Sequence, residues 1–267
     1  MRPRWDRRLT RMARDPDDPR LDERYRRNLS CPGGDVTLVG VVHDHPASVF
    51  RAGAIVESQA PDAVALELPP LAVPLFRSLA GREGGGEMSA AIAAAPDARH
   101  VGIDGIDRRF LRTLFERVRD DWPSVGTLGS LARESVAFSR TALRCRTTAL
   151  LPRPSAVRPN RHGDGQYDCE PTDPPAVQAE CEREHVDRCL AFARAVRTPD
   201  AVRLRDEVRE ACMAERIDDL RRDGDVVAVL GVAHLQSVAQ RLASAQVTKR
   251  NVESRSTSGR RGELRRR

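Results

Sequence analysis

The chain has 267 residues, of which 40% are hydrophobic and 31% are charged, and its formal net charge is +6. This length allows one domain with a substantial core, and no apolar run approaches the roughly 18 residues that a membrane-spanning helix needs. The charged N-terminus is not followed by the apolar segment of a secretory signal, so we expect a soluble, cytoplasmic protein.

The excess positive charge lies at the C-terminus. After Gln246 the chain carries eight basic and two acidic residues, and the rest of the sequence is formally neutral. We therefore expect a disordered basic tail over 246–267 that makes non-specific contacts with anionic surfaces, and no specific nucleic-acid site on the folded body. Residues 1–34 hold dense mixed charge and few apolar positions, which predicts a flexible lead-in.

The folded body begins at residue 35 with an apolar run that ends in Gly-Val-Val-His43. Its β-branched residues predict a buried strand, and the spacing of apolar residues after it predicts a helix over 48–60. A second apolar run over 63–68 contains Glu67 and is closed by two prolines. This strand–helix–strand order predicts parallel pairing with a right-handed crossover.

The remaining pattern predicts an α/β domain over 35–245, with a central, mainly parallel sheet, flanking helices and a helical insertion. Further helices are predicted at 71–80, 88–95, 108–119, 128–144, 176–196, 200–222 and 235–245, and further strands at 99–104 and 226–230. Proline, glycine and charge without periodicity predict an exposed loop over 151–175.

A second Gly-x-x-His motif, Gly-Val-Ala-His234, closes the last predicted strand. Because the carboxyl ends of parallel strands meet at one edge of a sheet, we expect His43, Glu67 and His234 to lie together there. Two imidazoles and a carboxylate suit a divalent metal or acid–base chemistry. The alternative is that both histidines only form hydrogen bonds within the core.

Four more charged residues are expected near this edge. Asp107 and Arg108 follow the predicted strand at 99–104, and Arg209 and Glu210 flank the apolar side of the helix over 200–222. Their positions predict that they take part in the same site.

The remaining histidines and the cysteines give weaker signals. Asp44 and His45 are expected to cap the helix over 48–60, with His45 facing solvent. The six cysteines form no C-x-x-C pair, so we expect reduced thiols. Cys181, His185 and Cys189 share one helical face, which allows a zinc site there, although ordinary helix packing is the more common use of such a face.

Five short segments carry a resemblance. They are Gly-Val-Val-His43, the strand ending in Glu67, Ile-Asp107-Arg108, Arg209-Glu210-x-x-Met213-Ala214 and Gly-Val-Ala-His234. In this order they resemble the motifs of the TraB/PrgY pheromone-shutdown family, which is similar to the Tiki metalloproteases. The chain departs from that family in having Val41 and Ala233 within the two Gly-x-x-His motifs and a basic tail instead of C-terminal membrane spans.

The resemblance implies a metal-dependent hydrolase of peptide bonds. The implied metal ligands are His43, Glu67 and His234. The metal would be manganese or cobalt, with zinc as a further choice. The implied catalytic residues are Glu210, as base toward a metal-bound water, and Arg209, Asp107 and Arg108.

Two other functions stay open. A non-catalytic member of the same family would bind a peptide or small ligand in this cleft, with Arg108 and Arg209 recognising a carboxylate. A nucleotide-binding protein is the third reading, although no glycine-rich phosphate loop follows any predicted strand. The sequence predicts no particular oligomeric state.

Overall fold

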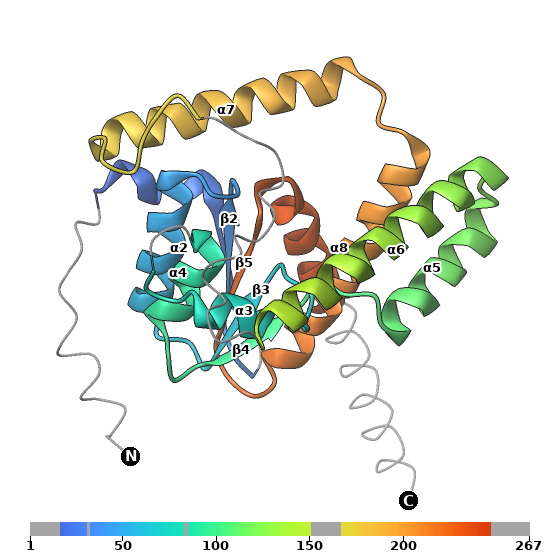
Figure 1. Ribbon diagram of the computed structural model, residues 1–267, viewed down its shortest axis with the longest axis horizontal. Helices are drawn as coiled ribbons and strands as arrows, with labels where there is room; N and C mark the ends of the chain where they lie inside the picture. The colour runs from blue at the N-terminus through green and yellow to red at the C-terminus, as the bar shows by residue number, and fades with distance from the viewer. Residues whose placement is uncertain (1–16, 31–32, 83–84, 151–166, 247–267) are drawn as a thin grey trace, which may run out of the picture.

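The computed structural model describes residues 17–30, 33–82, 85–150 and 167–246. A five-stranded sheet with the strand order β1-β2-β5-β3-β4 lies at its centre, and β1 is its antiparallel strand (Figure 1). The strands are β1 (Arg26–Leu29), β2 (Val36–Val41), β3 (Ala63–Leu66), β4 (Arg99–Gly102) and β5 (Val226–Gly231). The predicted α/β class with a mainly parallel sheet is confirmed.

Helices flank this sheet on both sides. They are η1 (Pro19–Leu21), η2 (Glu23–Tyr25), α2 (Pro46–Gln59), α3 (Val73–Ser78), α4 (Gly86–Ala94), α5 (Arg108–Asp121), α6 (Val125–Thr148), α7 (Pro175–Ala195) and α8 (Asp200–Leu220). Residues 232–246 are also helical. Every predicted helix is present with shifted bounds, and among the described residues no helix combines the length and apolarity that crossing a bilayer requires.

The two faces of the sheet are covered by different helices because successive residues of a strand point to opposite sides. From β5, Ala228 and Leu230 pack against α8 and the helix over 232–246. Val227 and Val229 pack against α2 and α4. All residues of β2, β3 and β5 are buried, which explains why their sequences are almost continuously apolar.

The N-terminal segment is more ordered than its composition predicts. β1 pairs with the free edge of β2, with Arg26 opposite Val39, and Tyr25 is 2% exposed. The prediction of a flexible lead-in is therefore wrong for residues 17–30, since strand pairing and the burial of one aromatic ring outweigh the local charge. Residues 1–16 and 247–267, which hold the rest of the lead-in and nearly all of the predicted tail, lie outside the described residues.

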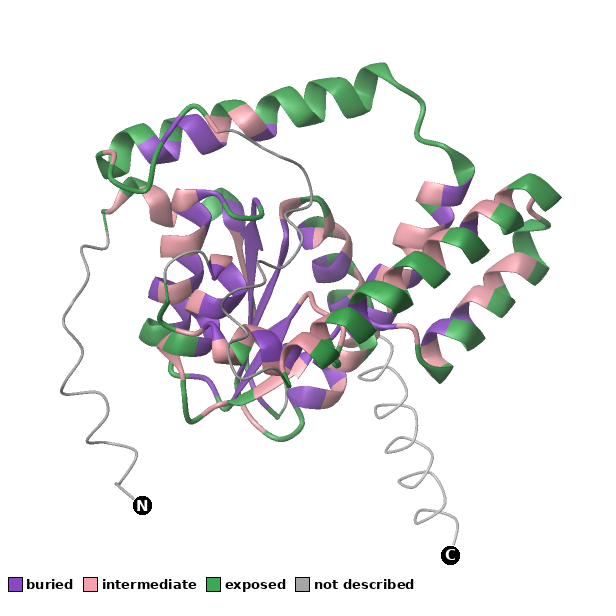
Figure 2. Ribbon diagram, in the orientation of Figure 1, coloured by how far each residue is buried: buried purple, intermediate pink, exposed green. Residues whose placement is uncertain are grey.

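The helical insertion comprises α5, α6 and α7, between β4 and α8. α5 and α6 pack on α8 through Phe110, Leu131, Leu204 and Val208. α7 lies across the end of the molecule, and from Asp187 onward its residues are exposed (Figure 2). Its first three turns therefore provide its contacts with the sheet domain. Of the predicted exposed loop, residues 151–166 lie outside the described part of the chain.

A buried ion pair joins α7 to α2. The Arg51 guanidinium donates to both carboxylate oxygens of Glu182, at 2.8 and 2.5 Å, and the two side chains are 0% and 1% exposed. Ser48 donates a further hydrogen bond to Glu182. Because both charges have left water, each depends on the other for compensation.

We expect Glu182→Gln to lower the free energy of unfolding by about 3 kcal/mol, because it leaves the Arg51 charge buried and uncompensated. Urea denaturation measures this change. The matched control is Glu180→Gln, which removes an exposed partner of Arg183 on the same helix and should cost under about 0.5 kcal/mol. Equal decreases in the free energy of unfolding for the two variants would show that the buried Arg51–Glu182 pair contributes no more to stability than an exposed pair.

A second prediction concerns Gly102 at the end of β4. A Cβ atom there would lie 2.5 Å from the Leu68 carbonyl oxygen and 2.8 Å from the Pro70 nitrogen, which are backbone atoms and cannot rotate away. Gly102→Ala should therefore cost about 2 kcal/mol or more of stability. At Gly129, a helical glycine with open space around it, alanine should instead stabilise by about 1 kcal/mol. Thermal unfolding of both variants checks the opposite signs.

Candidate active site

The two Gly-x-x-His motifs meet at the carboxyl edge of the sheet because β2 and β5 pair in register. Three side chains surround Gly231: a Cβ atom built there would lie 3.3 Å from Glu67 Oε2, 3.8 Å from His43 Nε2 and 3.8 Å from His234 Cδ2. The structure therefore brings together His43, Glu67 and His234, as the sequence predicts.

A buried carboxylate holds the His43 ring. His43 Nδ1 lies 2.7 Å from Glu87 Oε1, and Glu87 Oε2 accepts a 3.0 Å hydrogen bond from the Asp44 amide. The hydrogen bond to Glu87 raises the pKa of His43 to about 9. Burial opposes the charge on Glu87, but the contact with His43 lowers the pKa of that carboxyl.

Glu87 was not found from the sequence. It is 4% exposed and lies in the first turn of α4, a helix that is otherwise rich in alanine and contains no other charged residue. An acidic residue on the buried face of such a helix was the available signal. The predicted helix begins at Met88, two residues after the observed start at Gly86, and so leaves Glu87 outside it.

The His234 ring is held in the same way. Its Nδ1 lies 3.0 Å from Glu210 Oε1, and its Nε2 lies 3.6 Å from Glu67 Oε1. Burial lowers the pKa of His234, but the hydrogen bond to Glu210 and the charge of Glu67 raise it, and the net shift is upward. Because Glu210 contacts Nδ1 and Glu67 lies near Nε2, the two carboxylates are on different sides of the His234 ring. Both imidazoles have a carboxylate at Nδ1, and their Nε2 atoms face Gly231 in the case of His43 and Glu67 with Arg209 in the case of His234.

Arg209 occupies the space beside Glu67. Its Nη2 donates to Glu67 Oε1 at 2.7 Å and to Asp104 Oδ2 at 2.8 Å, and its Nη1 lies 3.5 Å from His234 Nε2. Burial opposes the charge on Arg209, but the carboxylates of Asp104 and Glu67 raise its pKa above the usual value. The other oxygen of Glu67 accepts a 2.6 Å hydrogen bond from the Gly231 amide. Glu67 is thus held at both oxygens.

Two predicted site residues are not brought to this cluster. Asp107 caps α5 by accepting hydrogen bonds from the amides of Arg109 and Phe110, at 2.9 and 3.0 Å, and it pairs with Arg216. Arg108, the first residue of α5, is exposed. The placement of Asp107 and Arg108 is therefore corrected.

The physical reason lies in where the strand ends. β4 stops at Gly102, so the chain has already turned away from the sheet edge when it reaches Asp107. Asp104, two residues after the strand, is the residue of this segment that lies at the edge and pairs with Arg209.

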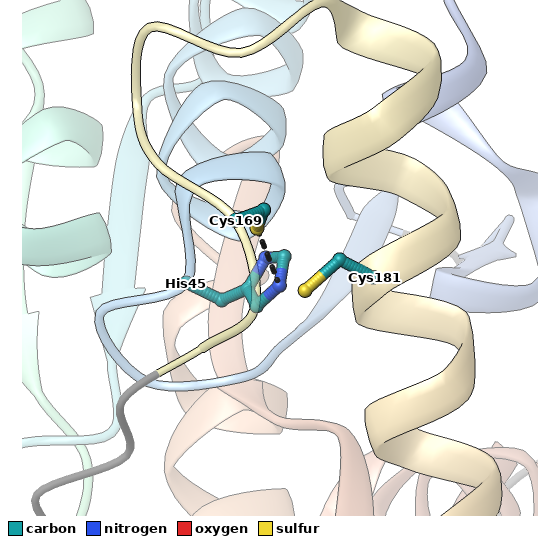
Figure 3. Close-up of side chains that lie close together, drawn as sticks. All are labelled: His45, Cys169 and Cys181. Atoms are coloured by element: carbon teal, nitrogen blue, oxygen red, sulfur yellow. Dashed lines mark hydrogen bonds between the residues drawn. The ribbon is translucent and has the colours of Figure 1, made fainter.

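A second cluster of possible metal ligands includes His45, in the turn after β2. His45, Cys169 and Cys181 could hold a metal ion, since one ligand atom from each lies within 4.8 Å of the others. The three side chains point toward one another from the β2–α2 turn, the segment before α7, and α7 itself (Figure 3). Among the residues that the structure describes, no other three such ligand atoms lie within 4.8 Å of one another. The ligand atoms of His43, Glu67 and His234 therefore span more than this distance.

His45 is the N-cap of α2, and its Nδ1 accepts a 3.2 Å hydrogen bond from the Ala47 amide. The prediction that His45 caps this helix is confirmed, whereas Asp44 is not the cap. The prediction that His45 faces solvent is wrong, because the ring is 0% exposed and the Tyr167 ring packs edge-on against it at 4.6 Å. Burial lowers the pKa of His45 to about 4.

Among the described residues, Cys181, His185 and Cys189 on one face of α7 do not have the spacing of a metal site. Cys181 points to His45 rather than along the helix, and Cys189 Sγ lies 3.6 Å from His185 Nε2 at an exposed position. His185 packs its ring against Tyr167. Ligands from one straight helix diverge, whereas the three ligands around His45 come from three segments that converge.

Comparisons with models of protein families, with curated proteins and with solved structures each find no match.

A prediction follows for His43 in protein freed of metal by a chelator. Because its folded pKa lies above the unfolded value, the stabilisation from the His43–Glu87 pair is fully present below pH 6.5 and is lost as the pH rises through about 9. NMR titration of the ring should give a pKa of about 9 in the wild type.

In Glu87→Gln the same titration should move down toward the ordinary histidine value of about 6.5. The control, Glu57→Gln, changes an exposed carboxylate on α2 and should leave the His43 titration where it was. A His43 pKa near the ordinary value in the wild type would contradict the assigned ion pair.

Proposed function

We propose that the chain is a metal-dependent hydrolase whose divalent cation binds at His43, Glu67 and His234. The observation that carries the proposal is the shared support of the two rings: each imidazole is held at Nδ1 by a buried carboxylate, while His43 Nε2 lies near Gly231 and His234 Nε2 lies near Glu67. Histidines that bind metals are commonly held in this way, since the carboxylate sets the orientation of the ring and increases its basicity.

The residues present fit a cation of the manganese or cobalt class. Two imidazoles and a carboxylate form a mixed nitrogen and oxygen donor set, which such ions accept, and zinc also accepts it. A bound divalent cation would polarise a carbonyl group and lower the pKa of a water molecule. The resemblance to the TraB/PrgY and Tiki proteins supports a peptide bond as the bond that is cleaved.

The surrounding residues have separate tasks in this proposal. Glu87 and Glu210 hold the two rings, and the Gly231 amide holds one oxygen of Glu67. Glu210 thus acts first as a positioning residue for His234, and its role as the base stays a prediction. Asp104 binds Arg209 through two hydrogen bonds and keeps its guanidinium beside Glu67, where it can bind an anionic group of a substrate.

One observation favours the alternative, a non-catalytic protein that binds a peptide or another small ligand. The Arg209 guanidinium contacts Glu67 Oε1 at 2.7 Å and lies 3.5 Å from His234 Nε2, so it competes with a cation for two of the three ligands. If Arg209 keeps this position, the site offers a guanidinium and a partly exposed imidazole to a carboxylate ligand. This alternative needs no metal.

Metal binding and hydrolysis test the proposal together. We expect wild-type protein to bind Mn²⁺ or Co²⁺ in calorimetry and to cleave members of a mixed peptide library. His234→Ala should lower the metal affinity at least about 100-fold and abolish cleavage, because it removes a ligand. The control is His100→Ala, which alters a histidine bonded to the Ala95 carbonyl outside the cluster and should change neither.

The outcomes separate the two functions. Binding of metal without cleavage of any peptide favours the binding protein, and failure to bind either metal overturns the hydrolase. Glu210→Gln refines the mechanism: an amide can still accept from the ring but cannot take a proton. If this variant keeps the metal and loses cleavage, Glu210 is the base; if it loses about tenfold in metal affinity with cleavage retained, it positions the ring.

A further inference from the structure

The cluster of His45, Cys169 and Cys181 shares no residue with the proposed catalytic centre and has a different chemistry. Two sulfurs and one imidazole nitrogen form a soft donor set, whereas the centre around Glu67 offers oxygen and nitrogen only. The three side chains are 0%, 8% and 8% exposed, so solvent hardly reaches them. His45 Nε2 and Cys169 Sγ already lie 3.6 Å apart.

We propose that His45, Cys169 and Cys181 bind a thiophilic divalent cation of the zinc class, which fastens α7 to the turn after β2. The three ligands come from three segments, and a water molecule would complete four-coordination. Zinc bound by cysteine and histidine is held at about 2.0–2.3 Å from each donor, so the sulfurs and the ring need to close in by a small rotamer adjustment. This inference goes beyond the proposed hydrolase and does not depend on it.

The binding step balances as follows. Each cysteine gives up its thiol proton to solvent and binds as a thiolate, so two protons are released for each cation. In the metal-free state Ala47 donates to His45 Nδ1, which leaves the ring proton on Nε2. Binding through Nε2 moves that proton to Nδ1, and the ring gives up its cap contact with Ala47. No oxidant or reductant takes part.

The location gives the cation a structural task. α7 is exposed from Asp187 onward, so its first three turns must hold it to the domain. The Tyr167 hydroxyl, two residues before Cys169, donates a 2.5 Å hydrogen bond to the His43 carbonyl. A cation at this cluster would therefore hold both α7 and the backbone of a predicted catalytic ligand. The cation would therefore have a structural role beside the proposed catalytic centre and would not take part in a second reaction.

The experiment uses the full chain purified without chelator, with elemental analysis and then titration of the metal-free protein with Co²⁺. We expect about one zinc ion that is lost in Cys169→Ser and Cys181→Ser, and a thiolate-to-cobalt charge-transfer absorption that only those variants lack. The matched controls are Cys212→Ser, a buried cysteine on α8, and Cys189→Ser, an exposed cysteine on α7; both should keep the zinc and the absorption.

Two further measurements keep the test decisive. His43→Ala and His234→Ala should retain the thiolate absorption even if they lose catalytic metal, so failure of the two proposals can be told apart. If a serine variant does not fold, the wild type still answers: zinc should raise its unfolding midpoint above that of metal-free protein. Absence of the thiolate absorption in the wild type, its persistence in Cys181→Ser, or no rise in the midpoint overturns the proposal.

Discussion

The parallel pairing of β2 with β5 is the constraint on which the rest of the structure depends. Val36 pairs with Val226 and the register runs without a break to Val41 and Gly231, although the two strands are about 190 residues apart in sequence. Backbone amides bonded to the side chains of Asp225 and Asp62 hold the opposite end of the strands. A slip of one residue would reverse the two faces of β5 and separate the two Gly-x-x-His motifs.

Charge compensation shapes the site that this pairing creates. Glu67, Asp104, Glu87 and Glu210 are all largely withdrawn from solvent, and each contacts Arg209 or a histidine. Removing any one partner would leave an uncompensated buried charge, which is costly. Arg209 provides much of this compensation. The proposed hydrolase requires Arg209 to release Glu67 so that Glu67 can bind a cation, whereas the proposed ligand-binding protein keeps the Arg209–Glu67 contact.

α7 and the segment before it are coupled to that site through contacts with the turn after β2 and with α2. The Arg51–Glu182 pair holds α7 to α2, the Tyr167 hydroxyl holds the backbone at His43, and the thiols of Cys169 and Cys181 meet His45 between them. In the sheet domain, these contacts fall between His43 and Arg51, within the turn after β2 and the first half of α2. Changes in how α7 is held are therefore expected to reach the carboxyl edge of the sheet.

The alternation of strands and helices can be predicted from the sequence, because burial on both faces of a parallel sheet produces apolar runs and an amphipathic helix produces a period of about 3.6 residues. The sequence also predicts that His43, Glu67 and His234 share an edge, since parallel strands end together. The contact of Glu87 with His43, the pairing of Arg209 with Asp104 and the addition of β1 to the sheet become visible only in the folded chain. Such contacts join residues distant in sequence, and the local periodicity that predicts helices and strands does not encode them.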